Sequence, residues 1–303
     1  MFTPPFAYVA PRSVPELLAL LDEHGADAKV LTGGQSLVPL LKLRLVRPAI
    51  IADANHLPGL DLVTDDGSHI SVGALVRHHQ MRTDPLICRY FPWLPDMVPL
   101  IGDPQVRSLG TLAGTLVEAD PAGDWSAAML ALGAEICAVS SAGRRTIPIA
   151  DWFMYSYTPA LKDNEFVEAV RLRKPAGPSG GCYMKVEKRA GDFAVAGCAV
   201  SVERDPASGS VAARVGLTGL AQAPLGCLLA AEALSGFGPD GVMADALATA
   251  KEAVQAAIDP ISDARGSAVY KREIANVVLE RAAATAFRVL AGGEAGDRRR
   301  RAS

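Results

Sequence analysis

The sequence predicts an α+β protein in which two parts of the chain order their elements differently. In the N-terminal part, short apolar segments typical of strands occur between helical patterns and glycine-rich turns. In the C-terminal part, three strand-like segments come first and two long helical patterns follow. Strands that are followed by helices, rather than alternating with them, are typical of the α+β class.

Residues 1–55 are expected to form a small lobe. Ser13, Pro15 and Glu16 form a capping box with proline in the first turn, and this pattern predicts a helix that Gly25 ends. Two short strands and an intervening turn of helix complete the lobe, at residues 30–31, 49–53 and 37–43 respectively.

Residues 56–174 are expected to form a second lobe. Its predicted strands are residues 69–73, 135–139 and 166–172. One helix is predicted to start within residues 74–81, and another to span residues 125–132. The first of these helices contains His78 and His79, which could suggest a metal site. Adjacent residues on a helix point in different directions and no carboxylate accompanies them, so ordinary structural histidines are favoured.

A domain boundary is expected within residues 172–181, which read LRKPAGPSGG, because Pro and Gly interrupt regular structure. Residues 178–290 then form a C-terminal domain, and residues 291–303, with the basic run 298–301, a disordered and solvated tail. The elements expected in this domain are strands at 182–186, 196–202 and 211–217, and helices at 242–258 and 268–290 whose alanine-rich faces pack closely.

Composition narrows the classes of function. The chain has 303 residues, of which 50% are apolar and 21% charged, and its net charge is −3. This balance gives no electrostatic case for binding nucleic acid or a membrane surface. No apolar stretch is long enough to span a membrane and no secretion signal begins the chain, so a cytoplasmic protein is expected.

No catalytic or metal-ligating set is evident in the sequence. The five cysteines are widely spaced and contain no C-x-x-C pair, so they are expected to be reduced, buried side chains. Neither G-x-S-x-G, nor H-E-x-x-H, nor a recognisable pair of carboxylates occurs. The chemistry is therefore expected to belong to a bound cofactor.

The first glycine-rich stretch, residues 32–36, reads TGGQS between a strand and a helical turn. Adjacent glycines permit positive φ and expose the main chain, so consecutive N–H groups before a helix can bind phosphate or pyrophosphate. A tight turn without a ligand explains the same two glycines equally well.

A second glycine-bearing stretch lies about eighty residues further on, within residues 101–124. Gly110 and Gly114 again leave the main chain accessible, and Asp120 and Asp124 follow as candidate partners for ribose hydroxyls. Two phosphate-sized loops suggest one dinucleotide held between two lobes. Neither loop matches G-x-G-x-x-G or a P-loop, which disfavours both of those nucleotide-binding folds.

Together, TGGQS and SLGTLAGTLVEADPAGD resemble the AGG(H/Q)S and TIGG motifs of the FAD-binding medium subunit of molybdenum hydroxylases. That family includes the flavoproteins of carbon monoxide dehydrogenase, quinoline oxidoreductase and the xanthine dehydrogenases, and the resemblance extends from Phe6 to about Leu290. Ala113 and Thr115 stand where the family usually has Gly and Asn. The alanine is a small change only if its φ is negative.

The resemblance implies a two-lobed FAD-binding domain of the vanillyl-alcohol-oxidase (PCMH-like) type, followed by an α+β domain of antiparallel strands and helices. It implies that FAD lies between the lobes, with its ring near the C-terminal domain. The two loops would hold the pyrophosphate, and carried over residue by residue they are Thr32, Gly33, Gly34, Gln35 and Ser36, and Thr111, Leu112, Ala113, Gly114 and Thr115.

Further cofactor contacts follow from the resemblance. Ile101 would lie beside the flavin ring, or in ordinary core. Asp124 would accept from a ribose or ribityl hydroxyl, or cap the helix that begins at Trp125. Leu161 would contribute main-chain contacts only.

Three more contacts are implied in the C-terminal domain. Lys185 would place positive charge near the pyrimidine edge of the flavin, unless it is a solvated strand lysine. Asp192 and Phe193 belong to a stretch, 189–193, that resembles a family segment reading R-x-G-D followed by an aromatic residue. Where the family aromatic is tyrosine, Phe193 lacks its hydroxyl.

The function implied is an electron-transfer subunit that passes electrons from 2Fe-2S clusters of a small subunit through FAD to an external acceptor. A large molybdopterin subunit would hydroxylate the substrate, and the complex is expected to be a dimer of heterotrimers. The alternatives are a free-standing FAD-dependent oxidoreductase of the same superfamily, and a non-catalytic module whose glycine loops are only turns. NAD, quinone and oxygen all stay open as acceptors.

Overall fold

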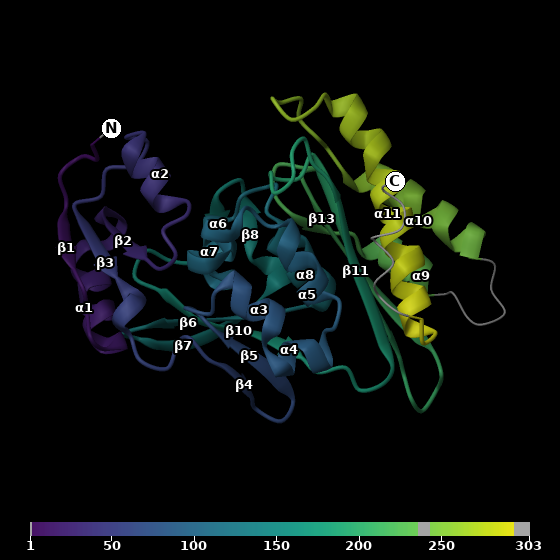
Figure 1. Ribbon diagram of the computed structural model, residues 1–303, viewed down its shortest axis with the longest axis horizontal. Helices are drawn as coiled ribbons and strands as arrows, with labels where there is room; N and C mark the ends of the chain where they lie inside the picture. The colour runs from purple at the N-terminus through teal and green to yellow at the C-terminus, as the bar shows by residue number, and fades with distance from the viewer. Residues whose placement is uncertain (1, 236–242, 294–303) are drawn as a thin grey trace.

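The computed structural model describes residues 2–235 and 243–293. The N-terminal lobe lies at one end of the molecule, an antiparallel sheet with its helices lies in the middle, and a second sheet with three helices lies at the other end (Figure 1). No helix in the described ranges is long and apolar enough to cross a membrane.

The N-terminal lobe is built on a three-stranded parallel sheet of order β1-β3-β2. Its elements are β1 (Ala7–Val9), α1 (Val14–His24), η1 (Gly25–Asp27), β2 (Ala28–Leu31), α2 (Leu37–Lys42), β3 (Ile50–Asp53) and η2 (Ala54–His56). The predicted start of α1 is confirmed, since Ser13 Oγ accepts from Glu16 N at 3.3 Å and Glu16 Oε2 accepts from Arg12 N at 2.8 Å.

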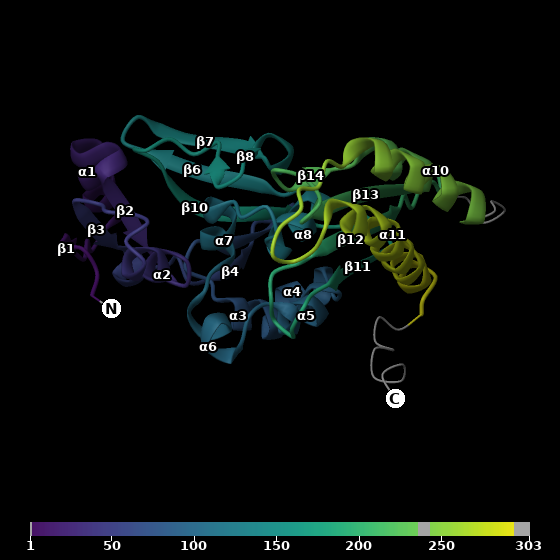
Figure 2. The same cartoon turned by 90° about the horizontal axis from the view of Figure 1, so that it is seen from above.

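The middle part is a five-stranded antiparallel sheet of order β4-β5-β10-β6-β7. Its strands are β4 (Val63–Asp65), β5 (His69–Gly73), β6 (Glu135–Ser140), β7 (Gly143–Pro148) and β10 (Phe166–Arg173). The helices that follow β5 lie along one side of this sheet (Figure 2). They are α3 (His78–Thr83), α4 (Pro85–Tyr90), α5 (Leu94–Met97), η3 (Val98–Leu100), α6 (Pro104–Leu109), α7 (Leu112–Glu118) and α8 (Asp124–Leu132). A small hairpin, β8 (Phe153–Tyr155) and β9 (Thr158–Pro159), follows η4 (Ile149–Asp151).

The expected helix start within residues 74–81 is confirmed, since α3 begins at His78. The amides of Ala74 and Leu75 donate to Glu168 O at 3.0 Å and to Leu60 O at 2.8 Å. These bonds keep the two residues after β5 connected to its neighbours, so the helix begins a few residues later.

The C-terminal part is a four-stranded antiparallel sheet, β11 (Ser179–Val186), β12 (Ala196–Arg204), β13 (Val211–Thr218) and β14 (Leu225–Gly226). The helices α9 (Leu228–Ser235), α10 (Met243–Ala257) and α11 (Ala268–Leu290) follow. The three predicted strands and both bounds of α11 are confirmed. Val242, where the preceding helix was expected to start, lies outside the described residues, as do residues 294–303 of the expected tail.

The sheet of this part is covered on both faces, by α11 and by α8 of the middle part. The Pro/Gly-rich stretch contributes to this packing rather than forming one long linker, because only residues 174–178 lie between β10 and β11. A Cβ at Gly180 would lie 2.2 Å from Ala286 O of α11, so this glycine lets sheet and helix main chains touch.

The buried side chains form two clusters. The first joins the N-terminal lobe to the middle part and extends to Tyr183 and Ala199 of the neighbouring sheet. The second lies between the C-terminal sheet and α9, α10 and α11. The two expected lobes of residues 1–55 and 56–174 therefore share one hydrophobic core.

Candidate FAD site

The two glycine loops come together at a cavity of about 570 Å³. Residues from 28–37, 110–118 and 157–167 line it. Nine of the ten loop residues expected to bind the cofactor are among them, as is Leu161; the exception is Leu112, whose side chain is buried in the core. The structure therefore brings two distant stretches of the sequence to one concave surface.

The glycines allow the two loops to touch each other. A Cβ at Gly33 would lie 2.5 Å from Leu109 O and 2.7 Å from the Cα of Gly110. A Cβ at Gly114 would lie 2.7 Å from Thr111 Oγ1. The hydroxyl of Thr111 is in turn 3.3 Å from the hydroxyl of Thr32. Close approach of main chain to main chain is thus a reason for glycine at these positions, separate from any ligand.

The first loop lines the cavity and contains main-chain donors that have no protein partner in the described residues. Gly34 has φ +69°, a left-handed conformation that turns the chain into α2. Within the described part of the chain, the N–H groups of residues 33–36 donate no hydrogen bond to protein. Consecutive donors in a turned main chain form a concave site for an anion. The first loop therefore contains consecutive main-chain donors that no protein group in the described residues uses.

The second loop offers fewer free donors. Thr111 caps α7, and its Oγ1 accepts from Gly114 N at 3.0 Å, so that amide is already used. Ala113 lies within α7 and its φ is not positive, so alanine replaces glycine there without strain. The hydroxyl of Thr115 donates to Thr111 O at 3.2 Å and supports the helix.

A series of side-chain hydrogen bonds, which the sequence did not reveal, connects the two loops. Asn55 Nδ2 donates to Thr32 O of the first loop at 2.8 Å. Arg77 donates to Asn55 Oδ1 at 2.6 Å and, through its other terminal nitrogen, to Leu109 O beside the second loop. Asp53 anchors Asn55, because Asp53 Oδ1 accepts from Asn55 N at 2.9 Å. No local pattern marks Arg77, since its partners come from distant segments.

His78 lies in the cavity wall and has an imidazole that is only 3% exposed. Its Nδ1 accepts from the indole Nε1 of Trp125 at 3.0 Å. Burial, together with the nearby Arg107 and Arg77 guanidinium groups, lowers the pKa of His78 to about 4. The ring packs against Gly110, where a Cβ would lie 2.6 Å from Nε2. These contacts fit the expectation that His78 is an ordinary structural histidine.

Two more residues that line the cavity, Glu118 and Tyr157, were not expected from the sequence. Burial, with the adjacent Asp120 carboxylate, raises the pKa of Glu118 to about 6. Burial also raises the pKa of Tyr157 to about 12, and its hydroxyl donates to Asp120 Oδ2 at 3.2 Å. Asp120 is thus engaged by protein donors and does not line the cavity.

The remaining expected cofactor residues gather elsewhere, at the junction of the middle part with the C-terminal sheet. They are Ile101, Asp124, Lys185, Asp192 and Phe193, and none of them lines the cavity. Asp124 is buried and accepts from the hydroxyl of Tyr183 at 2.5 Å and from Lys185 Nζ at 3.2 Å.

The alternative interpretation of Lys185 as a solvated strand lysine is wrong, because its side chain is 1% exposed. Ile101 is 9% exposed and belongs to the core cluster. Phe193 is 47% exposed, and the guanidinium carbon of Arg265 lies 5.3 Å from the centre of its ring.

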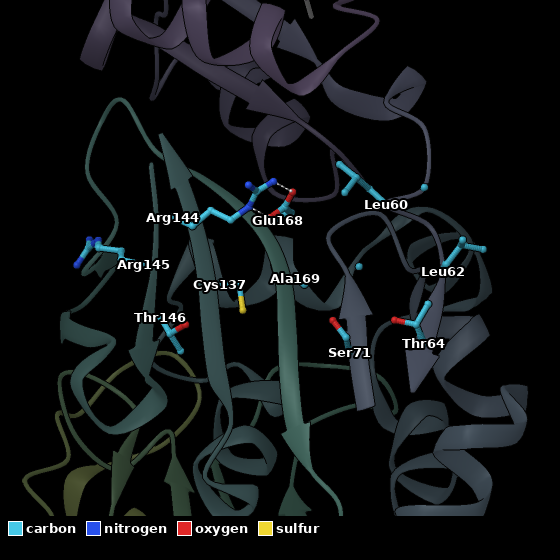
Figure 3. A pocket seen from close by; sticks show the side chains of 12 residues that line it. Leu60, Leu62, Thr64, Ser71, Cys137, Arg144, Arg145, Thr146, Glu168 and Ala169 are labelled. Carbon is cyan, nitrogen blue, oxygen red and sulfur yellow. Dashed lines mark hydrogen bonds and ion pairs between the residues drawn. The ribbon is translucent and has the colours of Figure 1, made fainter. Parts of the chain in front are cut away.

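A second cavity, of about 430 Å³, lies on the middle sheet and contains none of the expected cofactor residues (Figure 3). Thr64, Ser71, Cys137 and Thr146 contribute small polar side chains to it, beside the ion pair of Arg144 with Glu168. Burial raises the pKa of the Cys137 thiol. The expectation that all five cysteines are buried is wrong for Cys88, which is exposed, and for Cys137, which is only partly buried.

The chain matches two family models. Residues 4–175 match the FAD binding domain in molybdopterin dehydrogenase, and residues 181–286 match the CO dehydrogenase flavoprotein C-terminal domain. Among curated relatives, the carbon monoxide dehydrogenase medium chain of Hydrogenophaga pseudoflava is 35% identical over 93% of this chain and 97% of its own length. The 6-hydroxypseudooxynicotine dehydrogenase complex subunit alpha of Paenarthrobacter nicotinovorans is 34% identical over 95% of this chain and 96% of its own.

Solved structures agree with these matches. A chain of the Hydrogenophaga pseudoflava carbon monoxide dehydrogenase that lacks the Mo-pyranopterin moiety superposes with a TM-score of 0.89 at 35% identity, covering 95% of this chain and 99% of that one. A chain of quinoline 2-oxidoreductase from Pseudomonas putida 86 gives 0.87 at 30% identity, covering 96% and 99%. The predicted α+β fold, the FAD-binding domain and the assignment to an oxidoreductase subunit are confirmed. With family models matching both parts of the chain and relatives aligned over nearly all of it, this protein belongs to the FAD-binding medium subunits of the molybdenum hydroxylase family.

Proposed function

We propose that the diphosphate of FAD lies on the first glycine loop, in the cavity between the two loops. The observation that carries this proposal is the set of unused N–H groups at residues 33–36, in a loop that lines a cavity of about 570 Å³. A diphosphate requires several donors at once, and main-chain N–H groups supply them without a flexible side chain. Thr111, Ala113, Gly114 and Thr115 would form the facing wall.

The same proposal assigns the rest of the chain a role in binding and orientation. FAD, when bound, supplies the redox chemistry, and no side chain of this protein is assigned a catalytic role. Leu161 and Tyr157 would border the dinucleotide, because both line the cavity. Ile101, Asp124, Lys185, Asp192 and Phe193 would form the end of the site nearer the C-terminal sheet.

We propose further that the chain accepts electrons from 2Fe-2S clusters on a small partner subunit and delivers them at its FAD to an external acceptor. The names of its relatives support a medium-sized subunit of a larger enzyme. Within the described residues, no group of three or more His, Cys, Asp or Glu side chains could hold a metal ion. A large molybdopterin subunit would perform the hydroxylation, and the assembly would be a dimer of heterotrimers.

The pyrophosphate assignment can be tested with a matched pair at Ser36, a cavity-lining residue of the first loop. Ser36→Asp places a negative charge beside the proposed diphosphate, whereas Ser36→Asn introduces a side chain of similar size without charge. We expect Ser36→Asp to weaken FAD binding by about tenfold or more, because like charges at close range repel strongly near a protein surface. Titration of flavin-free full-length chain with FAD, followed by flavin fluorescence, measures the change.

Two further measurements make the test more specific: the dependence of FAD affinity on salt, and competition by fragments of FAD. Repulsion by the introduced carboxylate should weaken as ionic strength rises, and Ser36→Asn should bind FAD nearly as well as the original chain. ADP, which carries a diphosphate, should compete with FAD more strongly than riboflavin, which carries none. Equal FAD affinity of the two variants at low salt would refute the placement of the diphosphate on this loop.

A further inference from the structure

The first strand of the chain, β1, is an open edge of the N-terminal sheet. The order of this sheet is β1-β3-β2, so β1 has one strand neighbour among the described residues. Its three residues, Ala7, Tyr8 and Val9, are all exposed. An exposed edge strand presents unpaired N–H and C=O groups, and it can pair with a strand of another chain.

The bond of β1 to its neighbour shows which groups are free. Ala7 N donates to Ala49 O at 2.8 Å, on the side of β3. Successive N–H groups of a strand point to opposite sides, so the N–H of Tyr8 points away from β3. The N–H groups of Phe6 and Ala10, two residues to either side, donate no main-chain hydrogen bond within the described residues. The free edge therefore provides donors at residues 6, 8 and 10.

Prolines flank this edge without blocking it. Short strands with proline are a common protection of sheet edges against unwanted pairing. Here Pro5 and Pro11 occupy positions whose N–H groups, like that of Ala7, would point toward β3. These prolines remove donors from the side that already has a neighbour, and residues 6, 8 and 10 keep theirs on the open side.

A rigid loop with two exposed leucines follows α2 in the same lobe. Leu43 is 59% exposed and Leu45 is 68% exposed. The loop is a Schellman motif, because Leu45 N donates to Leu40 O at 2.9 Å and Arg44 N donates to Leu41 O at 3.0 Å. Arg44 has φ +59°, a conformation more usual for glycine. Leu45 stands where this motif often packs an apolar side chain on its helix, yet here the side chain is turned to solvent.

The surface formed by the edge and the loop is basic. The two segments adjoin, because Ala49 at the end of the loop accepts from Ala7. Residues 2–12 and 42–49 contain no Asp or Glu, although the net charge of the whole chain is −3. Their basic residues are all exposed, and they are Arg12, Lys42, Arg44 and Arg47. A partner with acidic side chains complements this surface.

From these features we propose that an extended, acidic segment of another protein chain of the enzyme adds a strand to β1 and packs apolar side chains against Leu43 and Leu45. The occupant is protein rather than lipid, because lipid tails supply no hydrogen-bond partner to an open sheet edge. This lobe lies at the opposite end of the molecule from the C-terminal sheet (Figure 1). That the partner belongs to the same enzyme rests on the proposed function, whereas the open edge rests on contacts within the chain.

Amide hydrogen exchange at single-residue resolution tests the added strand. The full-length chain is compared in isolation and in the natively purified assembly. We expect exchange at residues 6, 8 and 10 to slow by about tenfold or more in the assembly, because a neighbouring strand would accept from these amides. Equal exchange in both forms would overturn the inference and leave the proposed assembly intact. Recovery of the chain without any partner would overturn both.

A matched pair at Tyr8 isolates the hydrogen bonds of the edge. Tyr8→Pro removes the outward N–H, and proline is tolerated on an edge strand. Tyr8→Val keeps that N–H and, like Tyr8→Pro, lacks the hydroxyl that donates to Asp53 Oδ2. We expect Tyr8→Pro to bind the partner chains about tenfold or more weakly than Tyr8→Val, measured by titration of the separated partner chains. Equal affinities of two folded variants would contradict the added strand.

Charge reversal tests the basic surface independently and does not depend on how Tyr8→Pro folds. Arg44→Glu/Arg47→Glu should weaken assembly by about tenfold, and less at high salt, whereas Arg204→Glu on the C-terminal sheet should not. Binding of the isolated chain to phosphatidylserine vesicles that Leu43→Ser/Leu45→Ser abolishes, with residues 6–10 unprotected in the assembly, would assign the surface to a membrane instead. Protection that rises with the concentration of the isolated chain, and no further on assembly, would assign it to a second copy.

Discussion

At the scale of single residues, His78 shows how burial sets a charge state without a salt bridge. Its Nδ1 accepts a hydrogen bond from the Trp125 indole N–H at 3.0 Å, which only an unprotonated nitrogen can do. The neutral ring therefore carries its proton on Nε2. Protonating Nδ1 would both break this bond and bury a charge near two guanidinium groups.

This environment predicts a specific loss of stability in acid. The pKa of His78 is about 4 in the folded chain and 6.5 in its ordinary range, so the unfolded chain binds more protons between these values. The free energy of unfolding should fall as pH drops from 6.5 to 4, by about 3 kcal/mol from this group alone. Urea unfolding of the flavin-free chain at a series of pH values measures the slope.

The matched variant is His78→Asn, because the amide oxygen of Asn can still accept from the Trp125 indole. Its overall stability should be lower, since ring atoms are lost from a buried site. Its stability should nevertheless depend less on pH than that of the original chain over the same interval. Identical slopes in both proteins would mean that His78 is protonated in the folded state.

The types of residue in both loops could be predicted from the sequence, whereas their partners could not. The glycines at 33 and 114 stand out in the sequence because glycine leaves the main chain accessible at a turn. Lys185 has no such signal: nothing around it distinguishes a lysine that three distant oxygens enclose from one in solvent. Asn55 and Arg77 could not be identified from the sequence for the same reason, because their hydrogen bonds join distant parts of the chain.

At the scale of elements, the spacing of the two glycine loops depends on a short series of side-chain hydrogen bonds. Asn55 connects to the first loop through Thr32 O, and Arg77 connects Asn55 to Leu109 O. Both α2 and α7 are short, with six and seven residues, and isolated helices of this length are not stable in water. The loops therefore need tertiary contacts to stay in place.

We expect Asn55→Ala and Arg77→Met each to weaken FAD binding by about tenfold, and the double variant to be less affected than the two single effects combined. The coupling between the sites should be about 1 kcal/mol or more, because each substitution already breaks the same chain of bonds. FAD titration of the four proteins completes the double-mutant cycle. Arg82→Met, at an exposed arginine of the same helix, is the control. Strict additivity would show that the two side chains act independently.

The strands that sequence reasoning missed in the three larger sheets, as far as the structure describes them, are edge strands. They are β1, β4, β7 and β14. β1 is exposed along its whole length and β7 has one buried residue, so neither carries the alternation that marks a half-buried strand. The internal strands β5 and β12 were predicted because partners on both sides bury one face or both. Edge strands depend on a neighbour that the local sequence does not contain.

At the scale of the whole molecule, the chain is expected to work only within a larger enzyme. Native purification should recover it with a small iron–sulfur chain and a large molybdenum chain, because the proposed electron flow needs a donor that this chain does not supply. Gel filtration of untagged material, with iron, molybdenum and flavin analysis of the peak, tests the prediction. A metal-free monomer that turns over a substrate at an ordinary enzymatic rate would instead favour a free-standing flavoenzyme.

The position of Ala113 bears on how relatives of this chain should be recognised. The helix at 112–118 accepts an alanine at 113, whereas Gly114 lies under two threonine hydroxyls that leave no room for a methyl group. A search pattern that demands two consecutive glycines in this loop is therefore stricter than the fold. One that fixes the second glycine together with Thr32 and Thr111 would follow the steric requirement, and would retrieve chains that the stricter pattern discards.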